Sequence, residues 1–424
     1  MKKDEPSKTN GETGRIFYGW WVVAAAFLNL FFVVGIIFYG FPVFYPSFVE
    51  SLGFSRAQVT QGFFLGFLII GLPLGLLAGA VIDRVGARWV IVTGIGLVGI
   101  SLLLMARMTK LWQYEALCVL EVLGYVLAGP IANQVLVSRW FRSRRGRAMG
   151  IAYLGLGAGG VVAPLLVDHL IRTHGWRHAL EIIALVLMAV LLPAGVWVTR
   201  STPEKSGLLP DGESPNSSAS VVTGTMTSSR VMEAVQTRNF WLILMGSTLA
   251  IGAVGSVVQH FILFLKDQGY SATEASRFST GLLAASLAGR ILVGYAADHV
   301  RKKDAMALFY FLMGVSVLLL GMARQPAALW TFAVIFGFSM GADYMLVPLV
   351  TAESFGTASL GKLLALIIMG YSLGQWGLPW IVGRVFDTRH SYDLAWKITA
   401  LAGMIGGLAI WAVTLRQEKM EASR

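Results

Sequence analysis

Residues Ala284 to Lys303 read AASLAGRILVGYAADHVRKK, an apolar helical stretch that contains Arg290 and ends in an acid and a basic cluster. An ionised side chain near the centre of a bilayer costs about 2.5 to 3.5 kcal/mol on insertion scales, so it persists only where it faces a protein interior or a wet cavity. We therefore interpret Arg290 as a fixed cation that receives an anion. A structural ion pair inside a helical bundle is the alternative.

The rest of the chain has the composition of a membrane protein. Of its 424 residues, 56% are hydrophobic and 13% are charged, and the mean hydropathy is +0.67, which is too apolar for a soluble globular chain. Apolar runs of about 20 residues, long enough to cross the hydrocarbon core as helices, recur from end to end. We predict an all-α membrane protein with twelve transmembrane helices. Their expected limits are 19–46, 58–82, 89–106, 112–138, 147–171, 177–199, 239–265, 275–298, 305–323, 327–351, 361–383 and 394–415.

The basic residues predict how these spans are oriented. The even-numbered loops and both tails hold roughly 22 Lys and Arg, and the odd-numbered loops roughly 11, which by the positive-inside rule places both termini in the cytoplasm. The net charge of +11 then reflects this bias toward an anionic membrane leaflet rather than a nucleic-acid partner. No short apolar core with a cleavage site precedes the first span, so we expect no removable signal peptide.

A polar stretch divides the chain into two halves. Residues 200–230 are rich in Ser, Thr, Gly and Pro and lack an apolar period, which is typical of a flexible linker. We expect two pseudo-symmetric six-helix bundles. The expected segments are a cytoplasmic tail (1–18), an N-terminal bundle (19–199), a cytoplasmic linker (200–238), a C-terminal bundle (239–415) and a second cytoplasmic tail (416–424).

One loop motif occurs in both halves. Its residues are Gly79, Asp83, Arg84, Gly86 and Arg88 after the second span, and Gly294 and Asp298 after the eighth. A duplicated signal at matching places is typical of transporters built from structural repeats. An aspartate at a helix end can bind helix termini and basic side chains, so the motif is expected to hold the cytoplasmic side shut. A topogenic charge cluster is the alternative, but it does not explain the placed Gly and Asp.

Polar residues within other spans are candidates for the rest of the site. Glu121, Tyr125 and Asn133 follow one another on a single face of the fourth span, which lipid would penalise. Glu121 is either a proton carrier or a structural hydrogen-bond partner. In the seventh span, His260 is either a satisfied buried histidine or a ligand contact.

The tenth span adds Asp343 and Tyr344 at about the depth of Arg290. Whether they face Arg290 is not deducible from the sequence. The candidate proton-coupling residues are Glu121 and Asp343. The candidate substrate-binding residues are Arg290, Tyr125, Asn133, His260 and Tyr344.

These features resemble the major facilitator superfamily, and within it the monocarboxylate transporters and their oxalate/formate antiporter relatives. The family's fifth-helix signature is similar to Trp140, Phe141, Arg144, Arg145, Ala148, Gly150 and Ala152. Its opening Gly-Trp pair looks like Gly19 and Trp20, and its eighth-helix arginine, which binds the substrate carboxylate, falls on Arg290. The resemblance implies a secondary transporter that works by alternating access.

The chain also departs from the family pattern. Apolar residues around Phe38 stand where animal members carry a lysine, and Ser286 stands where they carry an aspartate. The family's proton relay therefore cannot be transferred residue by residue. The antiporters place a second base in the eleventh helix, and this chain has none between Lys362 and Arg384.

We expect a secondary transporter of small monocarboxylates such as lactate, pyruvate or acetate, with a proton as co-substrate. It is expected to act as a monomer in the cell membrane, without a cofactor or metal, and not as an enzyme, because no metal-ligand cluster or activated nucleophile stands out. An organic-anion antiporter of the oxalate/formate type is one alternative. A membrane sensor that binds a ligand without transporting it is another, although the linker carries no signalling module.

Overall fold

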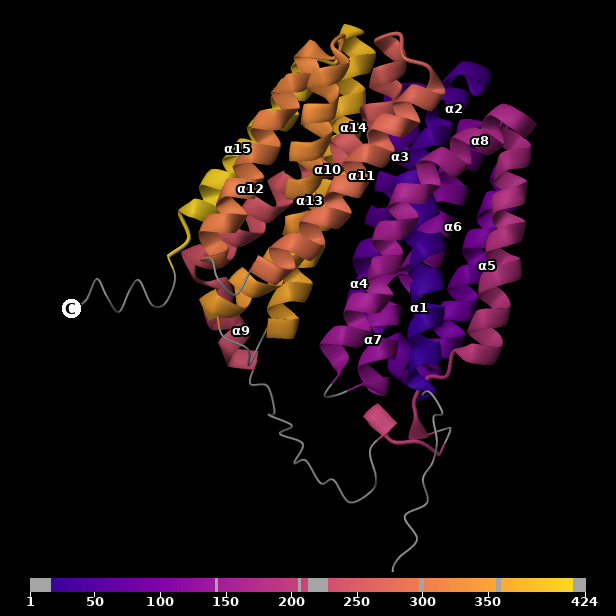
Figure 1. The fold of residues 1–424 in the computed structure, drawn as a ribbon, viewed down its shortest axis with the longest axis vertical. Helices are drawn as coiled ribbons and strands as arrows, with labels where there is room; N and C mark the ends of the chain where they lie inside the picture. Colours follow the sequence, from indigo (N-terminus) through magenta and orange to yellow (C-terminus); the bar gives the residue numbers. More distant parts are fainter. Residues whose placement is uncertain are drawn as a thin grey trace, which may run out of the picture.

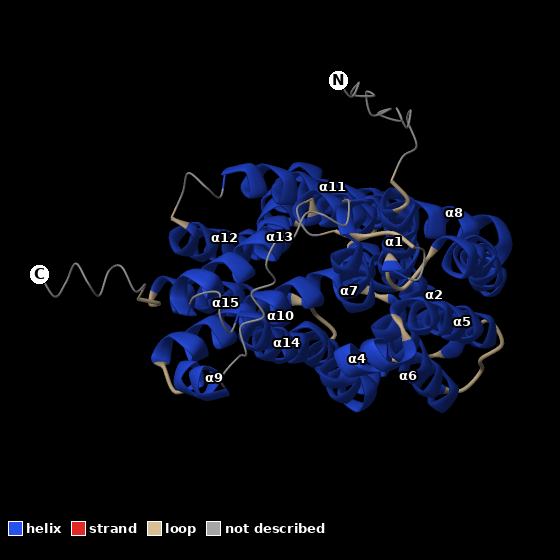
Figure 2. Ribbon diagram, turned by 90° about the horizontal axis from the view of Figure 1, so that it is seen from below, coloured by secondary structure: helices blue, strands red, loops and turns tan. Residues whose placement is uncertain are grey.

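The computed structural model describes residues 17–141, 144–204, 207–212, 228–296, 301–355 and 360–414. Within these ranges every regular element is a helix (Figure 2). Nine segments of the described chain are long and apolar enough to cross a membrane. One of them bends back at Gly175, where φ is 78°, so it supplies two spans. The helices α11 (Ala272–Ala296) and α14 (Leu360–Arg389) complete the expected twelve.

The helices form two bundles that lie side by side (Figure 1). The first bundle contains α1 (Gly19–Val34), η1 (Gly35–Gly40), η2 (Phe41–Phe44), α2 (Tyr45–Leu52), α3 (Arg56–Gly66), η3 (Phe67–Gly71), α4 (Leu72–Val85), α5 (Ala87–Met105), α6 (Leu111–Ala128), α7 (Pro130–Trp140), α8 (Arg145–Pro193) and η4 (Ala194–Val198). The second contains α10 (Arg238–Asp267), α11, α12 (Lys302–Val317), η7 (Leu318–Met322), α13 (Pro326–Phe355), α14 and α15 (Asp393–Trp411). The short elements η6 (Pro210–Gly212) and α9 (Ser228–Val235) lie between them in the chain.

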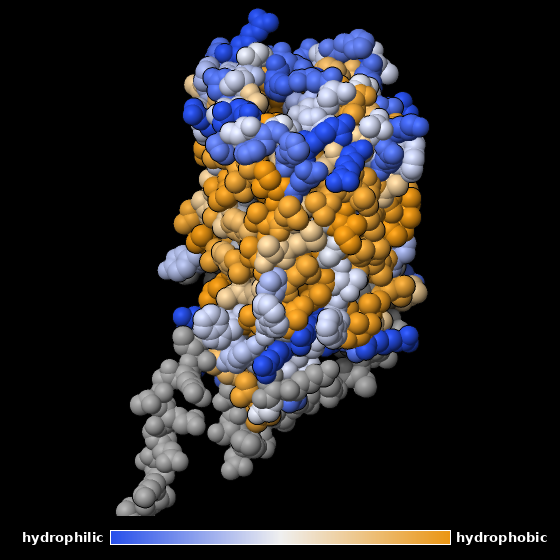
Figure 3. Space-filling model, turned by 90° about the vertical axis from the view of Figure 1, so that its right-hand side faces the viewer, coloured by the Kyte–Doolittle hydropathy of each residue, from blue (hydrophilic) through white to orange (hydrophobic). Residues whose placement is uncertain are grey.

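On the face that Figure 3 shows, an apolar band lies between two polar ends. This is the surface expected of a protein whose sides contact lipid and whose ends contact water. We call the end where α1 begins and η4 ends the linker side, because the Tyr18 hydroxyl donates to the Val198 carbonyl there at 2.8 Å. The opposite end, where α3 begins and α10 ends, is the distal side.

The first span and the first leg of α8 pack with their backbones almost in contact. A Cβ atom at Gly155 would lie 2.2 Å from the carbonyl oxygen of Phe27, and one at Gly159 would lie 2.2 Å from that of Phe31. Any larger residue would push these helices apart. The same register shows that the two helices run in the same direction, so the second leg returns to the linker side.

The fourth span, expected over 112–138, is found at Leu111–Trp140, but its helix is interrupted at Gly129. The chain is extended at Gly129 (φ −80°, ψ −154°), and α7 restarts with Pro130, which has no N–H to donate. The Asn133 amide donates to the carbonyls of Ala128 and Gly129 at 2.7 and 2.8 Å, and the Asn29 amide donates to Ala128 at 2.6 Å. These amides bind the carbonyls that the break exposes, so the break is a stable part of the bundle.

Candidate functional site

Arg290 lies at the interface between the two bundles. Helix α13 approaches the backbone around it closely, because a Cβ at Gly341 would lie 3.0 Å from the Arg290 amide nitrogen. The side chain extends toward the first bundle, where Nη2 donates to the hydroxyl oxygen of Tyr39 at 3.3 Å. The cation singled out by the sequence therefore contacts the opposite half of the molecule.

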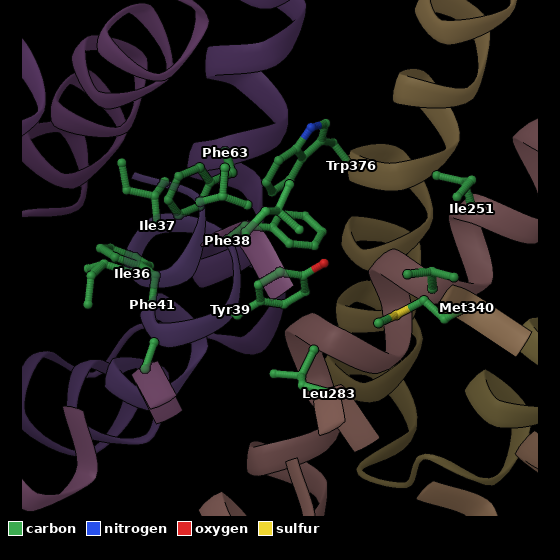
Figure 4. Close-up of a cluster of buried hydrophobic side chains, with 14 of the residues drawn as sticks. Ile36, Ile37, Phe38, Tyr39, Phe41, Phe63, Ile251, Leu283, Met340 and Trp376 are labelled. Atoms are coloured by element: carbon green, nitrogen blue, oxygen red, sulfur yellow. The ribbon is translucent and has the colours of Figure 1, made fainter. Parts of the chain in front are cut away.

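Tyr39 belongs to η1, a π-helical segment within the first span. Its ring is buried against Gly160, where a Cβ would lie 2.9 Å away, and packs edge-on against Phe38 with centroids 4.7 Å apart. π-helical segments occur frequently at functional sites. Figure 4 shows the Tyr39 hydroxyl pointing toward the second bundle, on the side of Leu283 and Met340.

Aromatic side chains from both bundles meet on the distal side of Tyr39. Trp376 of α14 stacks on Phe63 with centroids 5.4 Å apart and meets Phe38 edge-on at 5.6 Å (Figure 4). They enclose a cavity of about 10 Å³, which has room for about one water molecule. Its lining residues are Ile37, Phe38, Phe63, Phe67, Val122, Tyr125 and Trp376. The contact is therefore an apolar seal between the bundles.

Asp387 of α14 binds the beginning of α3 across the bundle interface. Its carboxylate accepts hydrogen bonds from the Ser55 hydroxyl at 2.7 Å and from the backbone N–H groups of Arg56 and Ala57, each at 3.1 Å. The first N–H groups of a helix lack intrahelical partners, and the helix dipole favours an anion there. A helix of one bundle is therefore capped by the other bundle.

Other polar contacts also join the bundles near this cap, and we call three of them, together with the cap, the distal latch. The three pairs are Arg56 with Asp267 at 2.6 Å, Glu50 with Lys266 at 2.5 Å, and Tyr45 with Gln259 at 2.6 Å. Among the described residues, the polar contacts between the bundles lie at the level of Arg290 or on its distal side. The structure is thus closed on the distal side.

His260 lies behind the distal latch. Its Nε2 is 2.8 Å from the Pro379 carbonyl oxygen and its Nδ1 is 3.0 Å from the Tyr392 hydroxyl. A carbonyl only accepts, so Nε2 carries a proton and, in the neutral ring, Nδ1 accepts from Tyr392. Nη1 of Arg56 donates to the same Tyr392 oxygen at 3.0 Å. The histidine is therefore hydrogen-bonded at both nitrogens, and Tyr392 connects it to Arg56 of the latch.

The two candidate acids are both buried, but their surroundings differ. The carboxylate of Asp343 accepts a hydrogen bond from the Tyr310 hydroxyl and interacts electrostatically with Arg290. Glu121 is fully buried in the first bundle, and neither of its oxygens has a hydrogen-bond partner among the described residues. Of these two acids, Asp343 is the one that interacts with Arg290 in the described structure.

The remaining candidate substrate residues are in different places. Tyr125 lines the small apolar cavity together with Phe38, the chain neighbour of Tyr39. Asn133 is bound to the carbonyls at the helix break. The side chain of Tyr344 lies outside what the structure describes.

The first copy of the loop motif contacts α7, η4 and Ser201, which follows η4 in the chain. Arg139 of α7 binds the carboxylate of Asp83, which is 71% exposed, and the Arg88 guanidinium donates to the Val196 carbonyl. Gly86 has a φ of 92°, a backbone conformation that favours glycine. Arg84 is exposed. Gly79 and Gly294 lie within helices, and Asp298 falls outside the described residues.

Three comparisons place the chain among known proteins. The family model for the Major Facilitator Superfamily matches residues 25–289 and 264–424. The chain is 26% identical over 339 residues to the MFS transporter asaE of Aspergillus flavus, covering 79% of this chain and 73% of that protein. It is 26% identical over 399 residues to monocarboxylate transporter 13 of Rattus norvegicus, covering 93% and 88%.

The fold is similar to that of a bacterial homologue of the human lysosomal transporter Spinster, solved in an inward-facing and unoccupied conformation. The TM-score is 0.66 at 15% sequence identity, with 94% of this chain and 95% of that chain covered. The family match, the fold and the apolar spans agree. The chain therefore belongs to the Major Facilitator Superfamily and is a multi-pass membrane transporter, not an enzyme.

Proposed function

We propose that this transporter carries small monocarboxylates, such as lactate, pyruvate or acetate, together with a proton. The observation that carries the proposal is the contact between Arg290 and Tyr39 at the bundle interface. A guanidinium offers planar, paired N–H donors that match a carboxylate, and a tyrosine hydroxyl adds another donor. The likeness to a monocarboxylate transporter from rat supports the same substrate class.

The interface position gives such a substrate a way to influence the conformation. A carboxylate bound to Arg290 and Tyr39 contacts both bundles at once, so its affinity changes when the bundles move relative to one another. The distal latch closes one route to this point. We assign the distal side to the outside of the cell membrane and the linker side, with both termini, to the cytoplasm, as the positive-inside rule predicts.

The two acids supply a mechanism for proton coupling. In the empty carrier, Asp343 balances the charge of Arg290, and a substrate carboxylate takes over this role and frees Asp343 to accept a proton. Glu121 has no hydrogen-bond partner among the described residues, and an ionised carboxylate buried in that way is costly. We therefore assign Glu121 as holding a proton in this state.

Uptake into proteoliposomes tests the substrate and the coupling together. We expect an inward proton gradient to drive accumulation of radiolabelled lactate, with pyruvate and acetate as competitors. Oxalate and succinate should compete poorly, because one fixed cation leaves their second carboxylate unpaired. If oxalate competes better than lactate, or if the gradient has no effect, the proposal is wrong and an antiporter of the oxalate/formate type replaces it.

A further inference from the structure

The hydroxyl of Ser286 is buried, and no described residue hydrogen-bonds to it. The side chain is 2% exposed, and its Oγ has no hydrogen-bond partner among the described residues. Buried helical serines normally return this bond to the carbonyl four residues earlier, as Ser256 does to Gly252 at 2.9 Å. An unpartnered buried hydroxyl costs stability, so its presence at a binding site is a sign of a ligand that pairs with it.

The hydroxyl lies on the same helix face as Arg290. Residues four apart in a helix share a face, with an axial separation of about 6 Å. Helix α13 packs against both positions, because a Cβ at Gly341 would lie 2.0 Å from the Ser286 carbonyl oxygen and 3.0 Å from the Arg290 nitrogen. Leu283, on the preceding turn, lies on the side of Tyr39 in Figure 4. Ser286 and Arg290 are therefore neighbours on one face of the helix that forms the site.

We propose that Ser286 binds the oxygen at position 2 of the substrate, so that the site prefers 2-hydroxy and 2-oxo monocarboxylates to unsubstituted ones. The inference rests on the proposed function, because it needs the substrate carboxylate at Arg290. In such acids the second oxygen is on the carbon next to the carboxylate, so one small molecule reaches both groups. A serine hydroxyl both donates and accepts, and thus suits either a hydroxyl or a carbonyl.

The selectivity follows because an unsubstituted acid leaves the Ser286 hydroxyl buried without a hydrogen bond. A site built to bond a substrate hydroxyl discriminates against an analogue that lacks it, since the protein group stays buried and unpaired. Lactate and propionate differ only in the 2-hydroxyl. Their ratio therefore isolates the contribution of Ser286 from that of the carboxylate contact.

The test compares the Ser286→Ala variant with wild type in proteoliposomes loaded with the full chain. We expect the ratio of kcat/KM for lactate over propionate to fall roughly five-fold, as the loss of one neutral hydrogen bond implies. Ser276→Ala is the matched control, because Ser276 is also buried in α11 without a hydrogen-bond partner among the described residues. It lies about 15 Å along the helix from Ser286, so it should keep the wild-type ratio.

The result that overturns the inference is an unchanged ratio, or an equal fall for both acids, in Ser286→Ala. The Arg290→Lys variant separates this failure from a failure of the proposed function. If Arg290→Lys abolishes uptake of both acids while the ratio of Ser286→Ala stays at the wild-type value, only the Ser286 inference fails. If wild type takes up neither acid, both fail. Thermal unfolding of Ser286→Ala should match wild type, since its hydroxyl makes no hydrogen bond to any residue that the structure describes.

Discussion

Nη2 of Arg290 and the hydroxyl oxygen of Tyr39 lie 3.3 Å apart, although 251 residues separate them in the chain. The arginine belongs to the second bundle and the tyrosine to the first, so this hydrogen bond crosses the interface that changes in the alternating-access mechanism proposed above. An anion that binds here replaces or joins a contact between moving parts. Binding and conformational change are therefore expected to be linked.

Replacing Tyr39 with phenylalanine tests whether the hydroxyl takes part in binding. We expect Tyr39→Phe to raise KM for lactate roughly two- to ten-fold, the effect of one lost hydrogen bond, with normal folding. Initial rates of uptake give the value. Tyr270→Phe is the control, because its hydroxyl donates to the Ala323 carbonyl at 2.9 Å at the distal end of the bundle. A KM equal to that of wild type would remove Tyr39 from the site.

The Asp387→Ala variant tests the distal latch. A helix cap contributes about 1 kcal/mol, so losing this one should shift the equilibrium roughly five-fold toward states that are open on the distal side. Spin labels at the exposed residues Ser51 and Thr388 would report the distance between the bundles there. The labels require Cys118→Ala, since Cys118 is the chain's one cysteine. Asp393→Ala, at an exposed acid of α15, should leave the distances as in wild type, and an unchanged distribution in Asp387→Ala would count against the latch.

The sequence predicted the spans and the central cation for the same physical reason. A run of about 20 apolar residues is typical of a membrane helix, and a charge within such a run persists only at a protected site. Both features can therefore be recognised within a short stretch of sequence. Tyr39 carries no such signal, because a tyrosine in an apolar helix costs little and its partner lies in the other half of the chain. The role of Asp387 could not be predicted for a related reason, since the helix that it caps belongs to the other bundle.

Two predictions from the fourth and seventh spans show where periodicity alone falls short. The continuous apolar run of the fourth span gave no indication of the break at Gly129, although the Gly-Pro pair at this point is a known turn signal. The alternatives for His260 also needed the structure, because its partners are Pro379 of α14 and Tyr392, which precedes α15. Both cases depend on contacts between elements rather than on spacing within one.

Substituting Asp83 tests the loop motif. Its pair with Arg139 is exposed, and such pairs contribute about 0 to 1 kcal/mol, so Asp83→Asn should scarcely change thermal unfolding. We expect slower turnover, because the motif biases the equilibrium between two conformations. The rate of lactate exchange checks this. Arg139→Gln removes the same pair and serves for comparison. Unchanged rates, with unchanged distances between spin labels, would leave the motif only a role in membrane insertion.

Neutralising the buried acids tests the coupling. We expect Glu121→Gln and Asp343→Asn each to lose proton-driven accumulation of lactate while some lactate exchange persists, because an amide keeps the shape of the acid but carries no titratable proton. Accumulation with and without a pH gradient measures this. Glu115→Gln is the control on the same helix, because the Gln61 amide binds that carboxylate at 3.1 Å. If both variants keep full proton-driven accumulation, the proton is carried elsewhere.

The most direct test of the account is lactate uptake by Arg290→Lys. An ammonium keeps the charge but lacks the planar pair of donors that grips a carboxylate, so initial rates should fall roughly ten-fold or more. Arg324→Lys, at an exposed arginine, controls for the substitution itself and should transport like wild type. Near-normal uptake by Arg290→Lys would contradict the claim that Arg290 is the anion site.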